Sequence, residues 1–493
     1  MKGPIRTALI ALCAVLVCLL LWLIPKPVNI PQPSEMLLLA SEGLDTIRIT
    51  ARLEPESRSL RVHQVLEMEN RTGQTQESLV LRTWPNAFQS MDTSPCTAED
   101  DLYDHYYPGG FSSGALVLSR ASDGKDLRYR YLDEAKTVLF LPLSEDWNPG
   151  QLVRIELEYT VQPPRMANRF GVWTDIWALG NAFAIPAVWQ DGAWRTDAYA
   201  PVGDPFLSEC ANYTAEITVP EGWRCAGTGV QQSAASDGKT VFSFSAPAVR
   251  EFALVLSPAF RTAQALEDDV LVTAYAKEAS DAKKMLGHAR KALRLYEDRY
   301  GSYPYQTFTL AEADFPAGGM EYPSLVMISS DMLKTGGREL EYAVAHETAH
   351  QWWYAVVGSD GWNHPWQDEA LCEFSLLSYA EAVYGAGEKE DLAYSRALSS
   401  LRMSVPQGVT PGSPLSAFSS MSEYSRVVYN RGLACLLALE ETVGGLDTFL
   451  RDYYTAYAFS IASRDDFEHM LAQSTAKDLE PLLRDYLDTS ILN

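Results

Sequence analysis

Apolar and polar residues alternate along much of the chain between residues 44 and 260, which predicts short β-strands. Turn sequences rich in Gly, Pro, Asn and Asp separate these alternating runs. The run at residues 154–161 shows the pattern well, with apolar side chains at Ile155, Leu157, Tyr159 and Val161. We therefore expect a β-rich, sandwich-like domain at residues 40–262, with one face of its sheets exposed to water.

The pattern changes to helical spacing near Leu266. In the next long run, residues 279–301, apolar residues recur every three or four positions, at Ala282, Met285, Ala289, Leu293 and Tyr296. The remainder of the chain alternates helical runs with loops that contain Gly and Pro. These features predict a separate, mainly α-helical domain at residues 266–493, and thus an α+β multidomain protein.

An uncharged apolar run occupies residues 7–24, after Lys2 and Arg6 and before Pro25. Its 18 residues are enough to cross a bilayer as a helix, so we expect a single-pass membrane anchor within residues 1–28. A cleaved signal peptide is the alternative, although no small-x-small cleavage pattern follows the run. With the basic end inside, the rest of the chain is expected outside the cytoplasm, at the cell membrane or secreted after cleavage.

The composition narrows the class of protein further. Lys and Arg total 40 against 64 Asp and Glu, so the formal net charge is −24 and we expect no nucleic-acid partner. Hydrophobic residues make up 47% of the chain, which excludes a disordered protein.

The cysteines do not indicate a disulfide framework. An odd number, five, lie beyond the predicted anchor. Cys210 and Cys225 are the nearest pair, but a predicted hairpin between them would place Cys225 opposite residue 218, so we expect no bridge. Cys372 and Cys435 lie in apolar helical patterns and are expected to be buried thiols.

His346, Glu347 and His350 form an HExxH sequence within a predicted helix at residues 339–357. Positions four apart lie on one helix face, so both imidazoles can bind one zinc ion at about 2.0–2.1 Å. Glu347 is turned about 100° from His346, near the open metal position, where a base for the attacking water must lie. Because the chain has only seven histidines, this spacing favours a metal site over two histidines packed in a core.

A catalytic zinc site needs a third protein ligand. A second helix is predicted to begin near Trp366, after Pro365, and Glu369 lies in its first turn, 19 positions after His350. A short loop returns two helices antiparallel, so Glu369 can complete the site. His364, in the loop, is the competing candidate for the third ligand. Alternatively, Glu369 binds no metal and is an acidic residue favoured at the start of a helix by the helix dipole.

The segments HETAHQWW and WQDEALCEF resemble the zinc-binding segment of the gluzincin aminopeptidases, the aminopeptidase N and leukotriene hydrolase family. The resemblance implies one Zn²⁺ per chain, held by His346, His350 and Glu369. It also implies a thermolysin-like catalytic domain that follows a saddle-shaped β domain.

Residues 318–322, Gly-Gly-Met-Glu-Tyr, resemble the exopeptidase motif GAMEN of the same family. The resemblance implies a substrate-binding segment made of Gly318, Gly319, Met320 and Glu321, in which Glu321 binds the free α-amino group. A fixed carboxylate paired with that ammonium places the first peptide carbonyl group at the metal. Tyr322 departs from the usual Asn, and Gln190 is the candidate amine ligand from the first domain.

The segment EYSRVVYNRG resembles the part of the family that carries its catalytic tyrosine. The resemblance implies that Tyr429 hydrogen-bonds the oxyanion and that Tyr424 lines the substrate side-chain pocket. The large carboxy-terminal helical domain of many family members does not follow. We therefore expect a less enclosed active site that admits peptides longer than short ones.

Together these features predict a membrane-anchored zinc aminopeptidase that acts on peptides with a free N-terminus outside the cytoplasm, with residues 7–24 in the bilayer. A zinc endopeptidase of the same fold would use the same metal chemistry without a free amine. An inactive peptide-binding or scaffold relative is the alternative from another class. Such a relative should have lost a ligand, the base or the tyrosine, whereas all are present.

Overall fold

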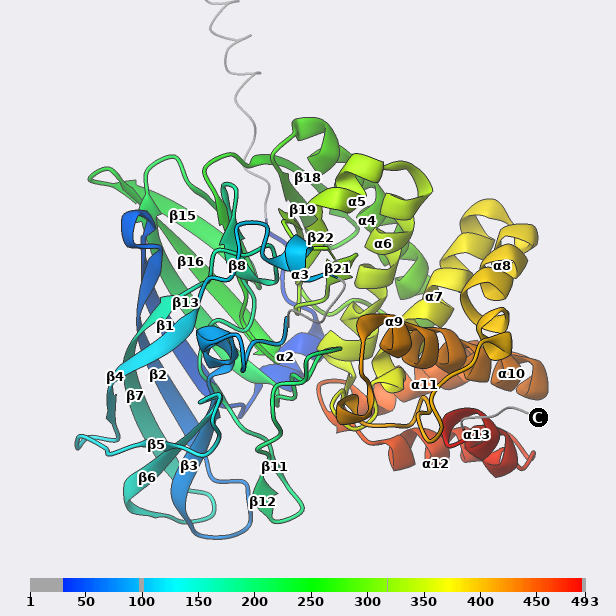
Figure 1. Ribbon diagram of the computed structural model, residues 1–493, viewed down its shortest axis with the longest axis horizontal. Helices are drawn as coiled ribbons and strands as arrows, with labels where there is room; N and C mark the ends of the chain where they lie inside the picture. Colours follow the sequence, from blue (N-terminus) through cyan, green and yellow to red (C-terminus); the bar gives the residue numbers. More distant parts are fainter. Residues whose placement is uncertain (1–29, 97–101, 317, 490–493) are drawn as a thin grey trace, which may run out of the picture.

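The computed structural model describes residues 30–96, 102–316 and 318–489, and it shows two parts of different secondary structure (Figure 1). Residues up to about 260, drawn blue to green, form mostly β-strands. The rest of the chain combines a five-stranded sheet and a short two-stranded one with most of the helices. The anchor predicted at residues 7–24 lies outside the described residues. Within the described ranges, no helix is both long enough and apolar enough to span a bilayer.

The largest sheet of the first part has seven strands in the order β15-β16-β13-β1-β2-β7-β4. Its strands are β1 (Thr46–Glu54), β2 (Ser59–Glu69), β4 (Ala115–Ser122), β7 (Leu152–Gln162), β13 (Ala211–Pro220), β15 (Val230–Ser236) and β16 (Lys239–Val249). Neighbours are antiparallel except β1 and β13. The β7 side chains that the alternation assigned to one face are all buried: Ile155, Leu157, Tyr159 and Val161. The sheet therefore has one face on the core.

Two four-stranded sheets and a hairpin complete the first part, so it is more elaborate than a two-sheet sandwich. One sheet has the order β10-β3-β6-β5, the other β14-β17-β9-β8, and the hairpin is β11-β12. Their bounds are β3 (Gln76–Arg82), β5 (Arg130–Tyr131), β6 (Val138–Trp147), β8 (Phe170–Trp173), β9 (Ile176–Leu179), β10 (Ile185–Pro186), β11 (Trp189–Gln190), β12 (Ala193–Trp194), β14 (Arg224–Gly227) and β17 (Leu254–Ser257). The second of these sheets contacts the sheet of the second part, so β9 and β17 are buried along their whole length.

The reasoning that excluded a Cys210–Cys225 bridge from a hairpin was wrong, although both thiols are free and buried. Cys225 lies on β14, which pairs with β17 and not with β13. A short turn in the sequence suggested a hairpin, but tertiary packing sends the chain from the large sheet to another one. Cys372 and Cys435 are buried, as their apolar surroundings predicted.

The second part contains a five-stranded sheet in the order β18-β19-β20-β22-β21. Its strands are β18 (Arg261–Glu267), β19 (Val270–Ala276), β20 (Thr307–Ala313), β21 (Gly319–Met320) and β22 (Leu325–Ser329). The predicted boundary between residues 262 and 266 cuts through β18, which pairs along its length with β19. The mainly helical prediction missed this sheet because β20 and β22 are buried on both faces and so do not alternate.

Most helices belong to the second part (Figure 1). They are α4 (Ala279–Tyr300), α5 (Ser330–Thr335), α6 (Gly337–Ala349), α7 (Trp366–Tyr384), α8 (Ala386–Leu392), α9 (Met421–Tyr424), α10 (Gly432–Val443), α11 (Asp447–Tyr457), α12 (Arg464–Ser474) and α13 (Glu480–Leu487), with α2 (Glu35–Ser41) and α3 (Tyr103–Tyr106) in the first part. Strands β23 (Gly358–Ser359) and β24 (Ile461–Ala462) pair between helices. Helix α4 contacts β18, β19 and α6 through the apolar face that its spacing predicted.

The helix predicted at residues 339–357 is divided in two. Helix α6 ends at Ala349, and a π-helical turn follows at Gln351–Val356. The buried guanidinium of Arg250, from the first part, donates to two carbonyl oxygens of that turn at 2.8 and 3.1 Å. A side chain at Gly358 would clash with it, since a Cβ there would lie 2.2 Å from Arg250 Cζ. This contact joins the two parts at the turn that directly follows the predicted metal ligand His350 in the sequence.

Candidate active site

The three predicted metal ligands converge from two helices. His346 lies in the last turn of α6, His350 directly follows that helix, and Glu369 lies in the first turn of α7. The Nε2 atoms of the two histidines are 3.2 Å apart, and each lies 3.4 Å from Glu369 Oε2. All three side chains are buried. Two helices joined by a short loop therefore bring the ligands together, as their spacing predicted.

This donor set fits zinc. Tetrahedral zinc binds nitrogen and oxygen at about 2.0–2.2 Å, which places its ligand atoms roughly 3.3–3.5 Å from one another. The observed separations of 3.2–3.4 Å are close to these values. Glu369 Oε2 is buried without a hydrogen-bond partner in the described structure, so a cation would satisfy it. Three protein ligands leave the fourth position of the metal for water or substrate.

Glu373 orients one of the ligands from behind. Its Oε1 lies 3.0 Å from His346 Nδ1, and Arg396 holds both of its oxygens at 2.8 and 2.9 Å. Burial alone would raise the pKa of Glu373, but Arg396 and His346 lower it to about 2. A charged carboxylate on Nδ1 directs Nε2 of the imidazole toward the metal position. The sequence reasoning missed Glu373, although it follows Glu369 by four residues on the same helix face.

Glu347 lies next to the ligands, where a base for the attacking water is needed. Glu321, Glu347 and His350 each place one oxygen or nitrogen within 4.8 Å of the others. Burial raises the pKa of Glu347 to about 8, with His346 opposing this rise and Glu321 adding to it. A Cβ at Gly319 would lie 2.3 Å from Glu347 Cδ, so only glycine allows this approach. The glycine of the exopeptidase motif thus makes room for the base.

A chain of buried hydrogen bonds holds Tyr322, which stands where the motif usually has Asn. The Tyr322 hydroxyl donates to Asn181 Oδ1 at 2.8 Å. The Asn181 amide and the Tyr354 hydroxyl both donate to the carboxylate of Glu251. Since Asn181 and Glu251 belong to the first part, this chain fixes the motif to that part, and with it the adjacent Glu321.

Tyr424, at the end of α9, and Tyr429, in the turn that follows it, complete the site. The π-helical turn Ser425–Arg431 places the Tyr429 hydroxyl where it donates to Glu369 Oε1, and its ring stacks on His346 with centroids 6.0 Å apart. Burial raises the pKa of Tyr429 well above its ordinary value, so the phenol keeps its proton and can donate. Tyr424 is buried, and its ring meets that of Tyr429 edge-on at 5.7 Å.

These side chains line one cavity of about 100 Å³ between the two parts of the chain. Of the predicted site residues, Gly318 does not line it, whereas the following are among its walls: Gly319, Met320, Glu321, His346, Glu347, His350, Glu369, Tyr424 and Tyr429. From the first part, Arg169 and Asp204 enter as an ion pair. Sequence reasoning missed both, because no local pattern connects residues so distant along the chain.

Two candidates from the sequence lie elsewhere. Gln190 is on β11, where its Oε1 accepts a hydrogen bond from Arg195 at 2.7 Å, and it does not line this cavity. The guess that it binds the substrate amine was therefore wrong. His364 is also absent from the ligand cluster, because it stays in the loop before α7.

Comparison with known proteins agrees with this geometry. Residues 285–486 match the model of the peptidase family M1 domain. This segment is therefore a peptidase family M1 domain, of the gluzincin aminopeptidase type. The match covers the metal ligands, Glu321, Glu347 and both tyrosines.

Among similar proteins, aminopeptidase N of Lactobacillus helveticus is 28% identical over 244 residues, 45% of this chain and 28% of that protein. Leukotriene A-4 hydrolase of Xenopus laevis is 27% identical over 208 residues, 39% of this chain and 32% of that protein. Aminopeptidase B of Rattus norvegicus is 24% identical over 312 residues, 57% of this chain and 45% of that protein. The chain thus spans less than half the length of these relatives.

Solved structures extend the likeness of the M1 fold to both parts. The M1 zinc metallopeptidase of Deinococcus radiodurans superposes with a TM-score of 0.63 at 17% identity, over 91% of this chain and 95% of that one. A point mutant of that enzyme, bound to a Tyr-Ser-Ala substrate, gives a TM-score of 0.65 at 17% identity over the same shares. The family match and these zinc enzymes agree with the predicted cofactor, Zn²⁺.

Proposed function

We propose that this chain is a zinc-dependent aminopeptidase, which hydrolyses the N-terminal peptide bond of peptides. The observation that carries the proposal is the position of Glu321 beside His350 and Glu347, with one oxygen or nitrogen of each within 4.8 Å of the others. In any amino acid the α-nitrogen lies about 2.5 Å from its own carbonyl carbon, and the next residue begins about 3.8 Å farther along. An ammonium group on Glu321 therefore brings the first peptide bond to the metal ligands.

The residues of the site have separate roles in this proposal. His346, His350 and Glu369 would hold the ion. Zinc bound there would lower the pKa of water and polarise the scissile carbonyl group. Glu347 takes the proton of the attacking water and returns it to the leaving amine.

Two more residues act on the substrate itself. The Tyr429 phenol donates a hydrogen bond to the oxygen of the scissile carbonyl as negative charge develops on it. Glu321 pairs with the ammonium and so sets which bond is cleaved. The half-buried ion pair of Arg169 and Asp204 forms part of the wall around the substrate.

A panel of aminoacyl arylamides tests the proposal. We expect hydrolysis of the free-amine substrates, loss of hydrolysis with a chelator and recovery with added zinc. The acetylated substrates should not be hydrolysed, because acetylation removes the ammonium that Glu321 binds. Equal hydrolysis of acetylated substrates would indicate a zinc endopeptidase, and a zinc-loaded protein without any hydrolysis would indicate a binding or scaffold relative.

We also propose that residues 7–24 anchor the protein in a membrane, with its catalytic part outside the cytoplasm. The support is the uncharged apolar run after Lys2 and Arg6. Alkaline carbonate extraction of expressing cells tests this, and the full-length protein should remain in the membrane pellet. A released protein that starts after the apolar run would indicate a cleaved signal peptide instead.

A further inference from the structure

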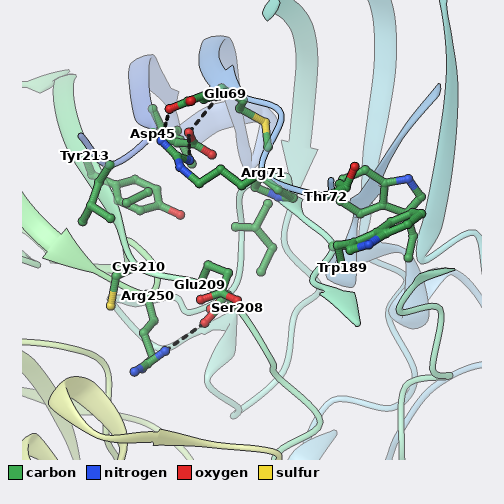
Figure 2. A pocket seen from close by; sticks show the side chains of 18 of the residues that line it. Asp45, Glu69, Arg71, Thr72, Trp189, Ser208, Glu209, Cys210, Tyr213 and Arg250 are labelled. Carbon is green, nitrogen blue, oxygen red and sulfur yellow. Dashed lines mark hydrogen bonds and ion pairs between the residues drawn. The ribbon is translucent and has the colours of Figure 1, made fainter. Parts of the chain in front are cut away.

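A second cavity, of about 340 Å³, is lined by residues of the first part and by Phe459 of the second (Figure 2). None of the metal ligands, Glu321, Glu347 or the site tyrosines lines it. Its volume falls within the range of small-molecule sites, at about 300–1,000 Å³. The proposed peptide hydrolysis uses none of the residues that line this cavity.

Aromatic side chains form much of its wall. Trp147, Trp189, Trp194 and Tyr213 all line the cavity. The rings of Trp189 and Trp194 meet edge-on with centroids 5.1 Å apart. Aromatic faces pack well on a flat apolar ring, and they also attract a cation.

Inside the cavity, the hydroxyl group of Tyr213 has no hydrogen-bond partner among the described residues. The side chain is 2% exposed, and its oxygen points into the cavity (Figure 2). The indole N–H of Trp194 is also buried without a partner in the described structure. Buried polar groups are normally hydrogen-bonded, so the Tyr213 hydroxyl favours a ligand with a polar atom at its inner end.

The charge around the cavity favours a cation. The Arg71 guanidinium pairs with the carboxylates of Asp45 and Glu69, at nitrogen–oxygen distances of 2.6 and 3.0 Å (Figure 2). These three side chains together carry one net negative charge. Glu209 is exposed and has no ion-pair partner among the described residues. Arg250, the other cation of the lining, donates its hydrogen bonds to backbone carbonyl groups. The cavity lining therefore contains three carboxylates and two guanidinium groups, and its net charge is negative.

We propose that this cavity binds a small organic cation of the hydroxyaryl-alkylamine class. The aromatic ring packs among the tryptophans, the ammonium group pairs with Glu209, and the phenol hydroxyl hydrogen-bonds Tyr213. An amino acid with a free carboxylate fits less well, because the excess negative charge repels it. The proposal concerns a site separate from the metal centre and holds whether or not the chain hydrolyses peptides.

Calorimetric titration of the zinc-loaded full chain with three probes tests the proposal. The probes are tyramine, phenethylamine, which lacks the hydroxyl, and 3-(4-hydroxyphenyl)propionate, which carries a carboxylate in place of the amine. One hydrogen bond should make tyramine bind about 3- to 10-fold more tightly than phenethylamine. The propionate should bind more weakly than either amine. Since the metal site could also take an amine, each titration is repeated with Glu321→Gln, which should leave tyramine binding unchanged.

Two variants and a matched control complete the test. Tyr213→Phe should abolish the preference for tyramine over phenethylamine. Glu209→Gln, at an exposed position, should weaken both amines about 2- to 5-fold. Glu42→Gln, also exposed but outside the cavity lining, should change neither. The proposal is overturned if tyramine binding is lost in Glu321→Gln, if no saturable binding occurs, or if Tyr213→Phe leaves the preference intact.

Discussion

Replacement of Glu251 by glutamine should change how the stability of the protein depends on pH. The carboxyl group is buried and accepts hydrogen bonds from Asn181 and Tyr354. Burial raises its pKa from 4.5 to about 7, while Tyr354 opposes the rise. Glu321 also raises this pKa, and the guanidinium groups of Arg169 and Arg250 lower it.

The folded protein binds the Glu251 proton more tightly than the unfolded chain does, so this proton stabilises the fold at low pH. The folded protein holds the Glu251 proton with a pKa of about 7, and the unfolded chain holds it with the ordinary value of 4.5. Below pH 4.5 both states are protonated and the full contribution to stability is present. It is lost as the pH rises through 7, and between pH 5 and 8 the loss is about 2.5 kcal/mol at about 1.4 kcal/mol per pH unit. The glutamine side chain of the variant has no proton to lose in this range.

Urea unfolding of both proteins at pH 5 and pH 8 measures the effect. The variant loses one acceptor oxygen, which costs the same at either pH. Relative to the wild type, Glu251→Gln should therefore gain about 2.5 kcal/mol of unfolding free energy between pH 5 and pH 8. Glu221→Gln, at an exposed position of the same part, is the matched control and should run parallel to the wild type. An equal difference between Glu251→Gln and the wild type at both pH values would refute the reasoning.

Three further substitutions test the metal site. Glu347→Gln should retain zinc, measured by metal analysis, and lose nearly all hydrolysis of an aminoacyl arylamide; substantial remaining turnover would contradict its role as base. Tyr429→Phe should lower kcat far more than it raises KM, because its hydrogen bond forms with the developing oxyanion, whereas a change in KM alone would assign it to binding. Glu373→Gln should weaken zinc binding about 10- to 100-fold in competition with a chelating dye, since the charged partner of His346 is lost. Glu381→Gln, an acid on the same helix with 40% of its side chain exposed, should bind zinc like the wild type.

Local spacing accounts for what the sequence predicted well. Helix spacing places His346 and His350 on one side of α6, and the return of the chain into α7 brings Glu369, in the first turn of that helix, to them. The strand β7 alternates because one of its faces meets water. The anchor at residues 7–24 stays a prediction, because it lies outside the described residues.

What the sequence did not predict depends on packing between distant segments. Strands β20 and β22 carry no alternation, because the sheet of the second part is covered on both faces. Arg169 and Asp204 reach the cavity only because the first part folds against the second. Glu373 could have been found, since a carboxylate one helical turn after a metal ligand can reach the imidazole of another.

Tyr322 shows how a departure from a motif acquires a physical reason. From the sequence alone, Tyr322 was only a departure from the motif and predicted no contact around Glu321. In the structure it begins a buried hydrogen-bond chain that passes through Asn181 and Glu251 of the first part and ends at Tyr354 of the second. A shorter Asn at this position could not reach that chain. The position of Glu321 therefore depends on both parts of the protein, although His346, His350 and Glu369 all belong to the second.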